Sequence, residues 1–210
     1  MFRDSLEQRP DWEFSVFDVT NGVFPQDVTA FDGVMIGGSP ASVMAGADWV
    51  STLEVLIREI VAARIPVFGA CFGHQVIAQA LGGRLGYNSD GWSFGRVLTE
   101  VVATLPWMTN VPEVMNLYSA HKEQVIEVPE GAQIWSKTVG CPVGGLAIGS
   151  HVFTTEYHPE MSPEFIAALV EELADVVGAD VTARARASLA IDADRALMGD
   201  WIARFFEGAG

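Results

Sequence analysis

The sequence predicts an α/β domain: a doubly wound, mostly parallel sheet with a small antiparallel β insertion and extra helices at the C-terminal end. Strand-like and helical segments alternate over residues 34–81, which is typical of a parallel sheet covered by helices on both faces. The middle of the chain contains strand-like runs only, and residues 163–206 return to helical spacing.

The alternating region contains two short apolar runs of strand character and two segments whose apolar side chains recur at helical spacing. Glycine and proline residues mark the ends of these segments. In chain order, we predict a strand at residues 34–36, a helix at 48–63, a strand at 67–70 and a helix at 74–81.

The middle of the chain supplies the predicted antiparallel insertion. Its runs are rich in β-branched and aromatic residues and are separated by turn residues. The Gly149-Ser150 dipeptide predicts a hairpin between the last two runs. We predict strands at residues 94–101, 114–118, 133–138, 145–148 and 152–157.

Three helical segments follow, at residues 163–177, 180–189 and 194–206. In the last of them Leu197, Trp201 and Phe205 share one face, so we expect this helix to pack onto the core. We therefore predict a single domain over residues 1–210, in which residues 178–210 form a C-terminal helical extension.

The N-terminal segment departs from this pattern. Residues 12–16 alternate between apolar and polar side chains and predict a strand, whereas residues 2–8 are charged and helical in character. A doubly wound domain normally opens on a buried apolar strand. We expect such a first strand to be missing from the N-terminus of this sequence; the alternative is a sheet built differently.

The composition argues against several classes of function. The 210 residues carry a formal charge of −15, and no cluster of positive charge is available to neutralise nucleic-acid phosphates. No apolar run is long enough to cross a bilayer, and the first residues lack a secretory pattern. The two cysteines, Cys71 and Cys141, form neither a disulfide framework nor a zinc motif. We expect a cytoplasmic protein with no metal, cofactor, nucleic-acid or membrane partner.

The segment Gly69-Ala70-Cys71-Phe72-Gly73-His74-Gln75 is the sharpest local motif. It places a cysteine between glycines at a strand-to-helix junction, where a tight turn requires small neighbours and projects the nucleophile above the sheet edge. The positive end of the following helix favours the thiolate form of Cys71. The alternative is a small, buried structural cysteine, which a lone cysteine usually is.

A cysteine nucleophile needs a base and a group that orients the base. His158 follows the last predicted strand, where functional residues collect in such sheets, and Pro159-Glu160 comes directly after it. Residues two apart in extended backbone point the same way, so Glu160 can hold one ring nitrogen while the other faces Cys71. Alone, this triplet is a weak motif; together with the cysteine motif it is a strong one.

These motifs resemble the class I, or triad, glutamine amidotransferases, and in particular stand-alone domains similar to the amidotransferase part of GMP synthase. The resemblance runs in order from about residue 31 to residue 163. It implies a flavodoxin-like sheet, no cofactor, and glutamine or a γ-glutamyl compound as substrate. The motifs that carry it are Gly69–Gln75, Tyr157–Glu160, Gly37–Pro40, Leu81–Gly83, Gly91–Gly95, Tyr118–His121 and Cys141–Val143.

The resemblance also implies roles for individual residues. Cys71 attacks the glutamine side-chain amide to form a γ-glutamyl thioester, His158 moves protons, and Glu160 orients His158. The backbone N–H groups of Gly38 and Phe72 hold the oxyanion, as the glycine turn and the residue after a nucleophile often do. The remaining implied contacts hold glutamine itself, through Gln75 and through the backbone around Tyr118, Ser119 and His121.

Two departures concern substrate contacts. Glu123 stands where the family often has aspartate, and Ser39 where it often has glycine. Three hypotheses therefore stay open. The chain releases ammonia from glutamine for a separate synthetase or acceptor subunit; it is a γ-glutamyl hydrolase or peptidase of the same superfamily; or it is a catalytically degenerate domain retained for binding or regulation.

Overall fold

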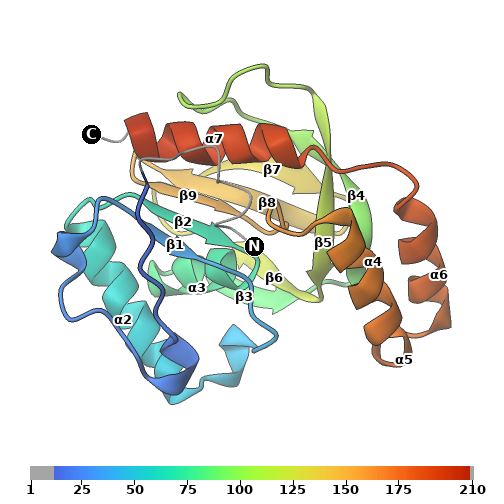
Figure 1. Cartoon of the computed structure of the whole chain (residues 1–210), viewed down its shortest axis with the longest axis horizontal. Helices are drawn as coiled ribbons and strands as arrows, with labels where there is room; N and C mark the ends of the chain where they lie inside the picture. The colour runs from blue at the N-terminus through green and yellow to red at the C-terminus, as the bar shows by residue number, and fades with distance from the viewer. Residues whose placement is uncertain (1–11, 209–210) are drawn as a thin grey trace.

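The computed structural model describes residues 12–208 and places a seven-stranded sheet at the centre of the protein (Figure 1). The strand order is β1-β2-β9-β8-β7-β4-β5. A separate two-stranded sheet pairs β3 with β6 antiparallel. The strands are β1 Val34–Ile36, β2 Val67–Ala70, β3 Arg84–Tyr87, β4 Ser93–Val101, β5 Val114–His121, β6 Glu123–Glu127, β7 Gln133–Thr138, β8 Cys141–Ile148 and β9 Val152–Thr155.

The large sheet is mixed, and its parallel part is confined to one side. Strands β1, β2 and β9 pair parallel, whereas β9-β8, β8-β7, β7-β4 and β4-β5 pair antiparallel. The predicted α/β class is confirmed, with the predicted antiparallel insertion forming much of the sheet itself. The predicted hairpin at Gly149-Ser150 is confirmed by the pairing of β8 with β9.

The helices cover both faces of the sheet. They are α2 Asp48–Ala62, α3 Phe72–Ala80, α4 Pro163–Glu172, α5 Ala174–Val177, α6 Ala179–Ser188 and α7 Arg195–Gly208. Three single-turn 3₁₀ helices, η1 Val19–Asn21, η2 Val28–Ala30 and η3 Val43–Ala45, lie before α2. Helix α7 runs along one face of the sheet, and α2 and α3 lie on the other (Figure 1).

Successive side chains of a strand point to opposite faces of the sheet, so one sheet can support a core on each face. Val67 and Val152 point toward α2 and α3 and join the core on that side. Their neighbours Phe68 and Phe153 point the other way and pack under α7. A third, smaller core joins α4 and α6 to β4 and β5.

Helix α7 is part of the main core. Trp201 and Phe205 are fully buried, and Leu197 packs against the same cluster, as the shared face predicted. The indole of Trp201 stacks edge-on against Trp135, with ring centroids 6.0 Å apart, and donates a hydrogen bond to the carbonyl of Thr109. Large aromatic side chains of this kind contribute much of the apolar area a core buries.

The predicted strand at residues 12–16 is wrong. The segment has no regular structure, because no neighbouring strand pairs with it in the described residues. Its alternating apolar side chains are not buried as a set: Val16 is 89% exposed, whereas Trp12 packs against the core under α7, edge-on to Phe206. The helix predicted at residues 2–8 lies outside the described residues.

Most other predicted elements are confirmed, with shifts of boundary. The helix predicted at residues 74–81 begins at Phe72, directly after the cysteine. The helix predicted at residues 163–177 breaks at Leu173 into α4 and α5. Strands β3 and β6 were not predicted, because each is short and pairs only with the other.

We predict that Phe205→Ala destabilises the protein by about 3–5 kcal/mol, because it leaves a cavity where the ring contacts Trp107, Phe153 and Phe206. Chemical denaturation of both proteins would measure the change. The matched control is Phe165→Ala, at a side chain that is 40% exposed, which should cost no more than about 1 kcal/mol. Equal losses in the free energy of unfolding of the two variants would show that α7 is not integral to the core.

Candidate active site

Cys71 occupies a tight corner between β2 and α3. Its backbone is at φ 48° and ψ −106°, a conformation that L-residues adopt only under strain. Strand β2 ends at Ala70 and α3 begins at Phe72, so Cys71 alone makes the turn. This is the geometry of the nucleophile elbow that the sequence predicts.

Two glycines make the corner sterically feasible. A Cβ at Gly73 would overlap the carbonyl oxygen of Ile36 at the end of β1. A Cβ at Gly69 would lie 2.6 Å from the carbonyl group of Gly73. The first turn of α3 therefore approaches β1 more closely than any side chain would allow, and this aims the helix N-terminus at Cys71.

His158 is brought to the corner by the neighbouring strand. The Cys71 N–H donates to the carbonyl of Thr155, the last residue of β9, over 2.9 Å. Three residues later, the His158 N–H donates to the carbonyl of Tyr118 in β5, also over 2.9 Å. The segment that carries His158 is thus held by backbone bonds at both ends.

The His158 ring is oriented by Glu160. Nδ1 of His158 lies 2.8 Å from Oε1 of Glu160, across the rigid Pro159. Cys71, His158 and Glu160 are all buried. Nε2 of His158 has no hydrogen bond of ordinary geometry to a described residue. The Cys71 side chain nevertheless acts on this imidazole through its charge and through a hydrogen-bonding contact, and such contacts often tighten only when substrate binds.

The pKa of His158 reflects these neighbours. Burial alone would lower it, but the negative charges of Cys71 and Glu160 and hydrogen bonding to both side chains raise it well above the ordinary imidazole value. The protonated, cationic form of His158 is therefore favoured. Because the folded-state pKa is raised, this charge stabilises the fold fully below about pH 6.5, and the contribution is lost as the pH rises through the folded-state pKa.

The Gly37-Gly38 loop lies directly against the imidazole. A Cβ added at Gly38 would lie 2.8 Å from Cε1 of His158 and 3.7 Å from Oε1 of Glu160. Phe72, the other predicted oxyanion donor, is the first residue of α3, where backbone N–H groups have no intrahelical partner. Its ring stacks on Trp49 at 5.3 Å. Both backbones thus border the corner, and their role stays a prediction.

The predicted substrate contacts occupy the interior beside α3. Gln75 is buried, and its Nε2 donates to the carbonyl of Glu123 over 2.8 Å and to Oε1 of Glu156 over 2.7 Å. Nδ1 of His121 lies 3.1 Å from the same Glu123 carbonyl. The glutamine contact proposed for Gln75 would have to come from its remaining carboxamide oxygen, because its backbone N–H donates to the Cys71 carbonyl over 3.0 Å.

Tyr118 and Ser119 lie in β5 and are buried. The hydroxyl of Ser119 lies 2.8 Å from that of Ser93 in β4 and donates to the Ser93 carbonyl over 3.2 Å. The carboxylate of Glu123, which departs from the family pattern, accepts a 2.7 Å hydrogen bond from Ser42 near the Gly37-Gly38 loop.

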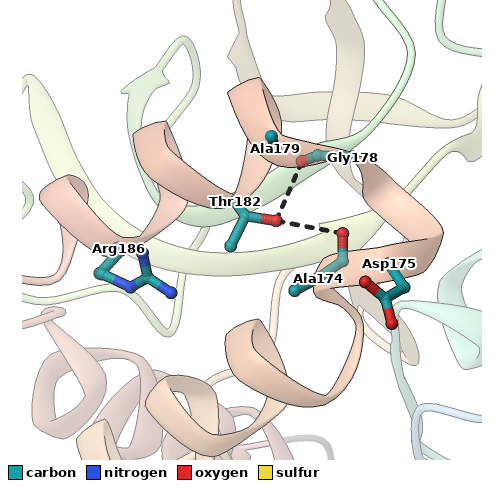
Figure 2. A pocket seen from close by; sticks show the side chains of 6 residues that line it. All are labelled: Ala174, Asp175, Gly178, Ala179, Thr182 and Arg186. Atoms are coloured by element: carbon teal, nitrogen blue, oxygen red, sulfur yellow. Dashed lines mark hydrogen bonds between the residues drawn. The ribbon is translucent and has the colours of Figure 1, made fainter.

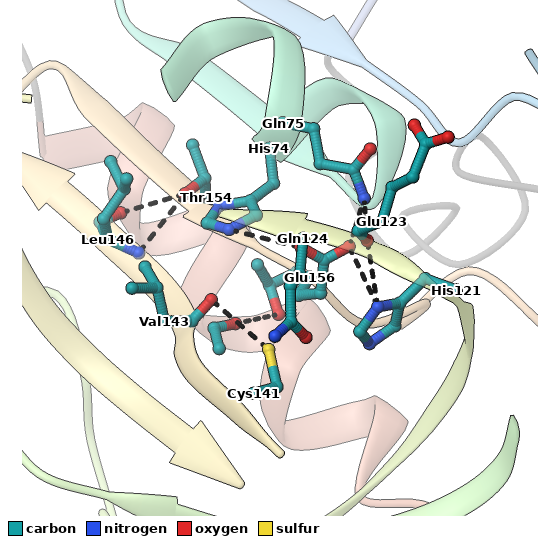
Figure 3. Close-up of polar contacts among 12 residues, drawn as sticks. His74, Gln75, His121, Glu123, Gln124, Cys141, Val143, Leu146, Thr154 and Glu156 are labelled. Carbon is teal, nitrogen blue, oxygen red and sulfur yellow. Dashed lines mark hydrogen bonds and ion pairs between the residues drawn. The ribbon is translucent and has the colours of Figure 1, made fainter. Parts of the chain in front are cut away.

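Sequence reasoning missed a buried carboxyl group beneath the corner. Glu156 is fully buried and faces His74, Gln75 and His121 (Figure 3). The position of Glu156, two residues before His158, was the available indication, since residues two apart in extended backbone point the same way. Cys141, expected to be structural, is fully buried, and burial is the main cause that raises its pKa.

A hollow of about 450 Å³ lies elsewhere on the surface, along α5 and α6 (Figure 2). It contains none of the predicted site residues; its lining residues are Ala174, Asp175, Gly178, Ala179, Thr182 and Arg186.

Among residues 12–208, no group of three or more histidine, cysteine or acidic side chains is placed to hold a metal ion. Within the same range, no helix combines the length and apolar character that crossing a bilayer requires.

Residues 11–169 match the sequence pattern of the family described as glutamine amidotransferase class-I. The chain belongs to this family. Gamma-glutamyl peptidase 3 of Arabidopsis thaliana is 30% identical over 175 residues, which are 80% of this chain and 70% of that protein. The glutamine-hydrolysing GMP synthase of Aeropyrum pernix is 30% identical over 129 residues, 61% of this chain and 24% of the synthase.

A solved glutamine amidotransferase from Methylobacillus flagellatus has the same fold. Its structure superposes with a TM-score of 0.78, covering 99% of this chain and 88% of that one, at 22% identity. The resemblance to class I glutamine amidotransferases that the motifs indicated is therefore confirmed, as is the fold. Relatives named for glutamine hydrolysis and for γ-glutamyl peptidase activity both occur, so family membership leaves the choice between these reactions open.

We predict that Cys71→Ser lowers the pKa of His158, because it removes the negative charge that most strongly favours the imidazolium while burial remains. An NMR titration of the His158 Cε1–H resonance would measure the shift. Cys141→Ser, at the other buried cysteine, should leave the titration of His158 unchanged. An unchanged midpoint in Cys71→Ser would mean that the two side chains do not interact.

We also predict that Gly38→Ala lowers kcat/KM by about 10²-fold, because the new methyl group displaces the His158 ring. Ser39→Ala is the control. It removes only a local turn hydrogen bond, to Ala41, and should leave the rate within a few-fold of wild type. Steady-state kinetics of the two variants would make the comparison, and equal rates would remove Gly38 from contact with the catalytic pair.

Proposed function

We propose that this family member hydrolyses γ-glutamyl amide bonds through a thioester on Cys71. The observation that carries the proposal is the strained strand–helix corner at Cys71 with the His158–Glu160 pair beside it. Cys71 has this backbone conformation and faces an imidazole whose pKa is raised, so that its cationic form is favoured. These are the attributes of an activated nucleophile.

In the first half-reaction, the sulfur of Cys71 attacks the γ-carbonyl carbon and forms the carbon–sulfur bond. The carbonyl oxygen becomes an oxyanion, for which the N–H groups of Gly38 and Phe72 are the proposed donors. The imidazolium of His158 gives its proton to the leaving nitrogen, the carbon–nitrogen bond breaks, and ammonia or an amine departs.

In the second half-reaction, neutral His158 takes a proton from water while the water oxygen attacks the thioester carbon. The carbon–sulfur bond breaks, glutamate leaves, and the thiolate–imidazolium pair is restored. Throughout both half-reactions, Glu160 holds Nδ1 of His158 and keeps Nε2 directed at the reacting atoms.

Glutamine is the leading substrate, with the released ammonia passed to a separate synthetase or acceptor subunit. A γ-glutamyl peptide is the second candidate, favoured by the likeness to Gamma-glutamyl peptidase 3, which extends over 80% of this chain. The two hypotheses share every step on Cys71. They differ only in the leaving nitrogen, which is ammonia in one case and an amino acid in the other.

We predict that a diazoketone analogue of glutamine alkylates Cys71 and not Cys141, because only Cys71 stands at the end of a helix beside an imidazolium. Mass spectrometry of the labelled peptides would locate the adduct. Cys71→Ser should abolish both labelling and hydrolysis, whereas Cys141→Ser should retain both. Labelling of Cys141, or of neither residue, would overturn the assignment of the nucleophile.

The substrate class is tested by measuring kcat/KM for glutamine and for a γ-glutamyl dipeptide with the same preparation, with and without candidate acceptor proteins. Preference for glutamine, increased by an acceptor, would establish the amidotransferase reaction. Preference for the dipeptide would establish the peptidase. Absence of turnover of both by a protein that still reacts with the analogue would support the third hypothesis, a degenerate domain.

A further inference from the structure

The described residues contain one buried carboxyl group that the proposed mechanism does not use. Glu156 is fully buried, and its side chain lies against His74 and Gln75 in the first turn of α3 (Figure 3). A buried carboxyl group is rare unless it is paired or neutral, because transferring an ionised carboxylate from water is costly.

The contacts of Glu156 are polar but not cationic. Oε1 accepts a 2.7 Å hydrogen bond from Nε2 of Gln75 and lies 3.9 Å from Nδ1 of His121. Oε2 faces Nε2 of His74 at 3.5 Å, and neither atom has a hydrogen bond of ordinary geometry among the described residues. The backbone of Val143 also acts on the His74 ring, and that of Val125 on the Glu156 carboxyl group. The ionisable groups around Glu156, taken from every element packed against it, are Cys71, His74, His121, Cys141, Tyr157 and His158.

Neither adjacent histidine can neutralise a carboxylate. Burial, then the charge of His121, lowers the pKa of His74 to about 3. Burial, with the charge of His158 adding to it, lowers the pKa of His121 to about 4, despite its hydrogen bond to Glu123. Both rings are therefore neutral at pH 7, and these short contacts are not ion pairs.

The hydrogen-bonding pattern leaves a place for one proton. Nδ1 of His74 lies 2.6 Å from the hydroxyl of Thr154. If Nδ1 carries the ring proton and donates it to Thr154, Nε2 is a bare acceptor directed at Oε2 of Glu156. A proton on Oε2 would form a hydrogen bond from Glu156 to Nε2 of His74. If the carboxyl group were ionised, these two atoms would face each other as two acceptors.

The location of Glu156 links the two halves of the proposed catalytic pair. Its backbone precedes His158 by two residues, and its N–H donates to the carbonyl of Gly144 over 2.9 Å. Its side chain contacts His74 and Gln75, which lie in the first turn of α3, directly after Cys71. One side chain therefore connects the end of β9 to the helix that presents the nucleophile.

We propose that Glu156 is a positioning residue that remains a neutral carboxylic acid, bridging His74 and Gln75 so that the first turn of α3 is held without a second negative charge beside Cys71. The inference rests on the proposed role of Cys71 as nucleophile. Burial, then the charge of Cys71, raises the pKa of Glu156 well above its usual value. This rise outweighs the Gln75 hydrogen bond, the charge of His158 and the Val125 backbone hydrogen bond, which all lower the pKa. An ionised Glu156 would repel the thiolate through the low-dielectric interior.

The proposal is tested first by infrared spectroscopy of the whole protein at neutral pH. The wild type should show the carbonyl stretch of a protonated carboxylic acid, and Glu156→Gln should lack it. Glu130→Gln, at an exposed glutamate, should retain the band. His74→Asn should shift the band by changing its hydrogen bond, whereas His151→Asn should not. Absence of the band from the wild type would overturn the proposal.

The second measurement is the rate at which iodoacetamide alkylates Cys71 between about pH 6 and pH 9. Glutamine is a neutral isostere that accepts from Gln75 and donates toward His74. Glu156→Gln should therefore keep the midpoint of the pH profile and a rate within about twofold of wild type. A midpoint about one pH unit lower would show that a negative charge had been removed, and would overturn the proposal.

Glu156→Ala distinguishes positioning from mere space filling. It removes both hydrogen-bonding atoms and should slow alkylation of Cys71 by about tenfold or more, with Glu156→Gln restoring the rate. An alkylation rate in folded Glu156→Ala equal to wild type would contradict a positioning role. If Glu156→Ala does not fold, the infrared and Glu156→Gln results still decide the matter. None of these measurements requires turnover, so they are independent of whether glutamine is the substrate.

Discussion

The close approach of α3 to β1 is the constraint on which the candidate site depends. Gly73 lies against the carbonyl of Ile36 with no room for a side chain, and this contact requires the chain to turn within the single residue Cys71. Because Ile36 is also the last residue of β1, the contact fixes where the Gly37-Gly38 loop begins. One steric condition thus positions the cysteine, the helix N-terminus and the loop that touches His158.

The two cysteines are both buried, but their electrostatic surroundings differ. Cys141 hydrogen-bonds weakly to the Val143 carbonyl in an interior that disfavours any charge on sulfur. Cys71 is nearly as buried but stands at the end of a helix and beside an imidazole that its own charge helps to keep protonated. Residue type and burial are therefore common to the two cysteines, and the arrangement of neighbouring dipoles and charges is what distinguishes them.

The sequence predicted the elements whose local pattern agrees with their environment. Helix α2 and strands β1 and β2 were found because their apolar spacing matches the faces they bury. The segment at residues 12–16 alternates equally well but has no neighbouring strand, and only tertiary context reveals that. For the site, glycine spacing indicated Cys71. The position of Glu156, two residues before His158, indicated only which way its side chain points; its significance comes from side chains of α3 and β5 that fold against it.

Strands β2 and β9 are neighbours in the sheet, yet six strands and α3 separate them in the chain. Cys71 and His158 are each anchored where one of these two strands ends. The entropic cost of closing such an excursion grows only with the logarithm of its length. Insertions and deletions within it can therefore accumulate without altering the separation of Cys71 and His158, so that the surrounding segments can diverge during evolution while this corner is inherited intact.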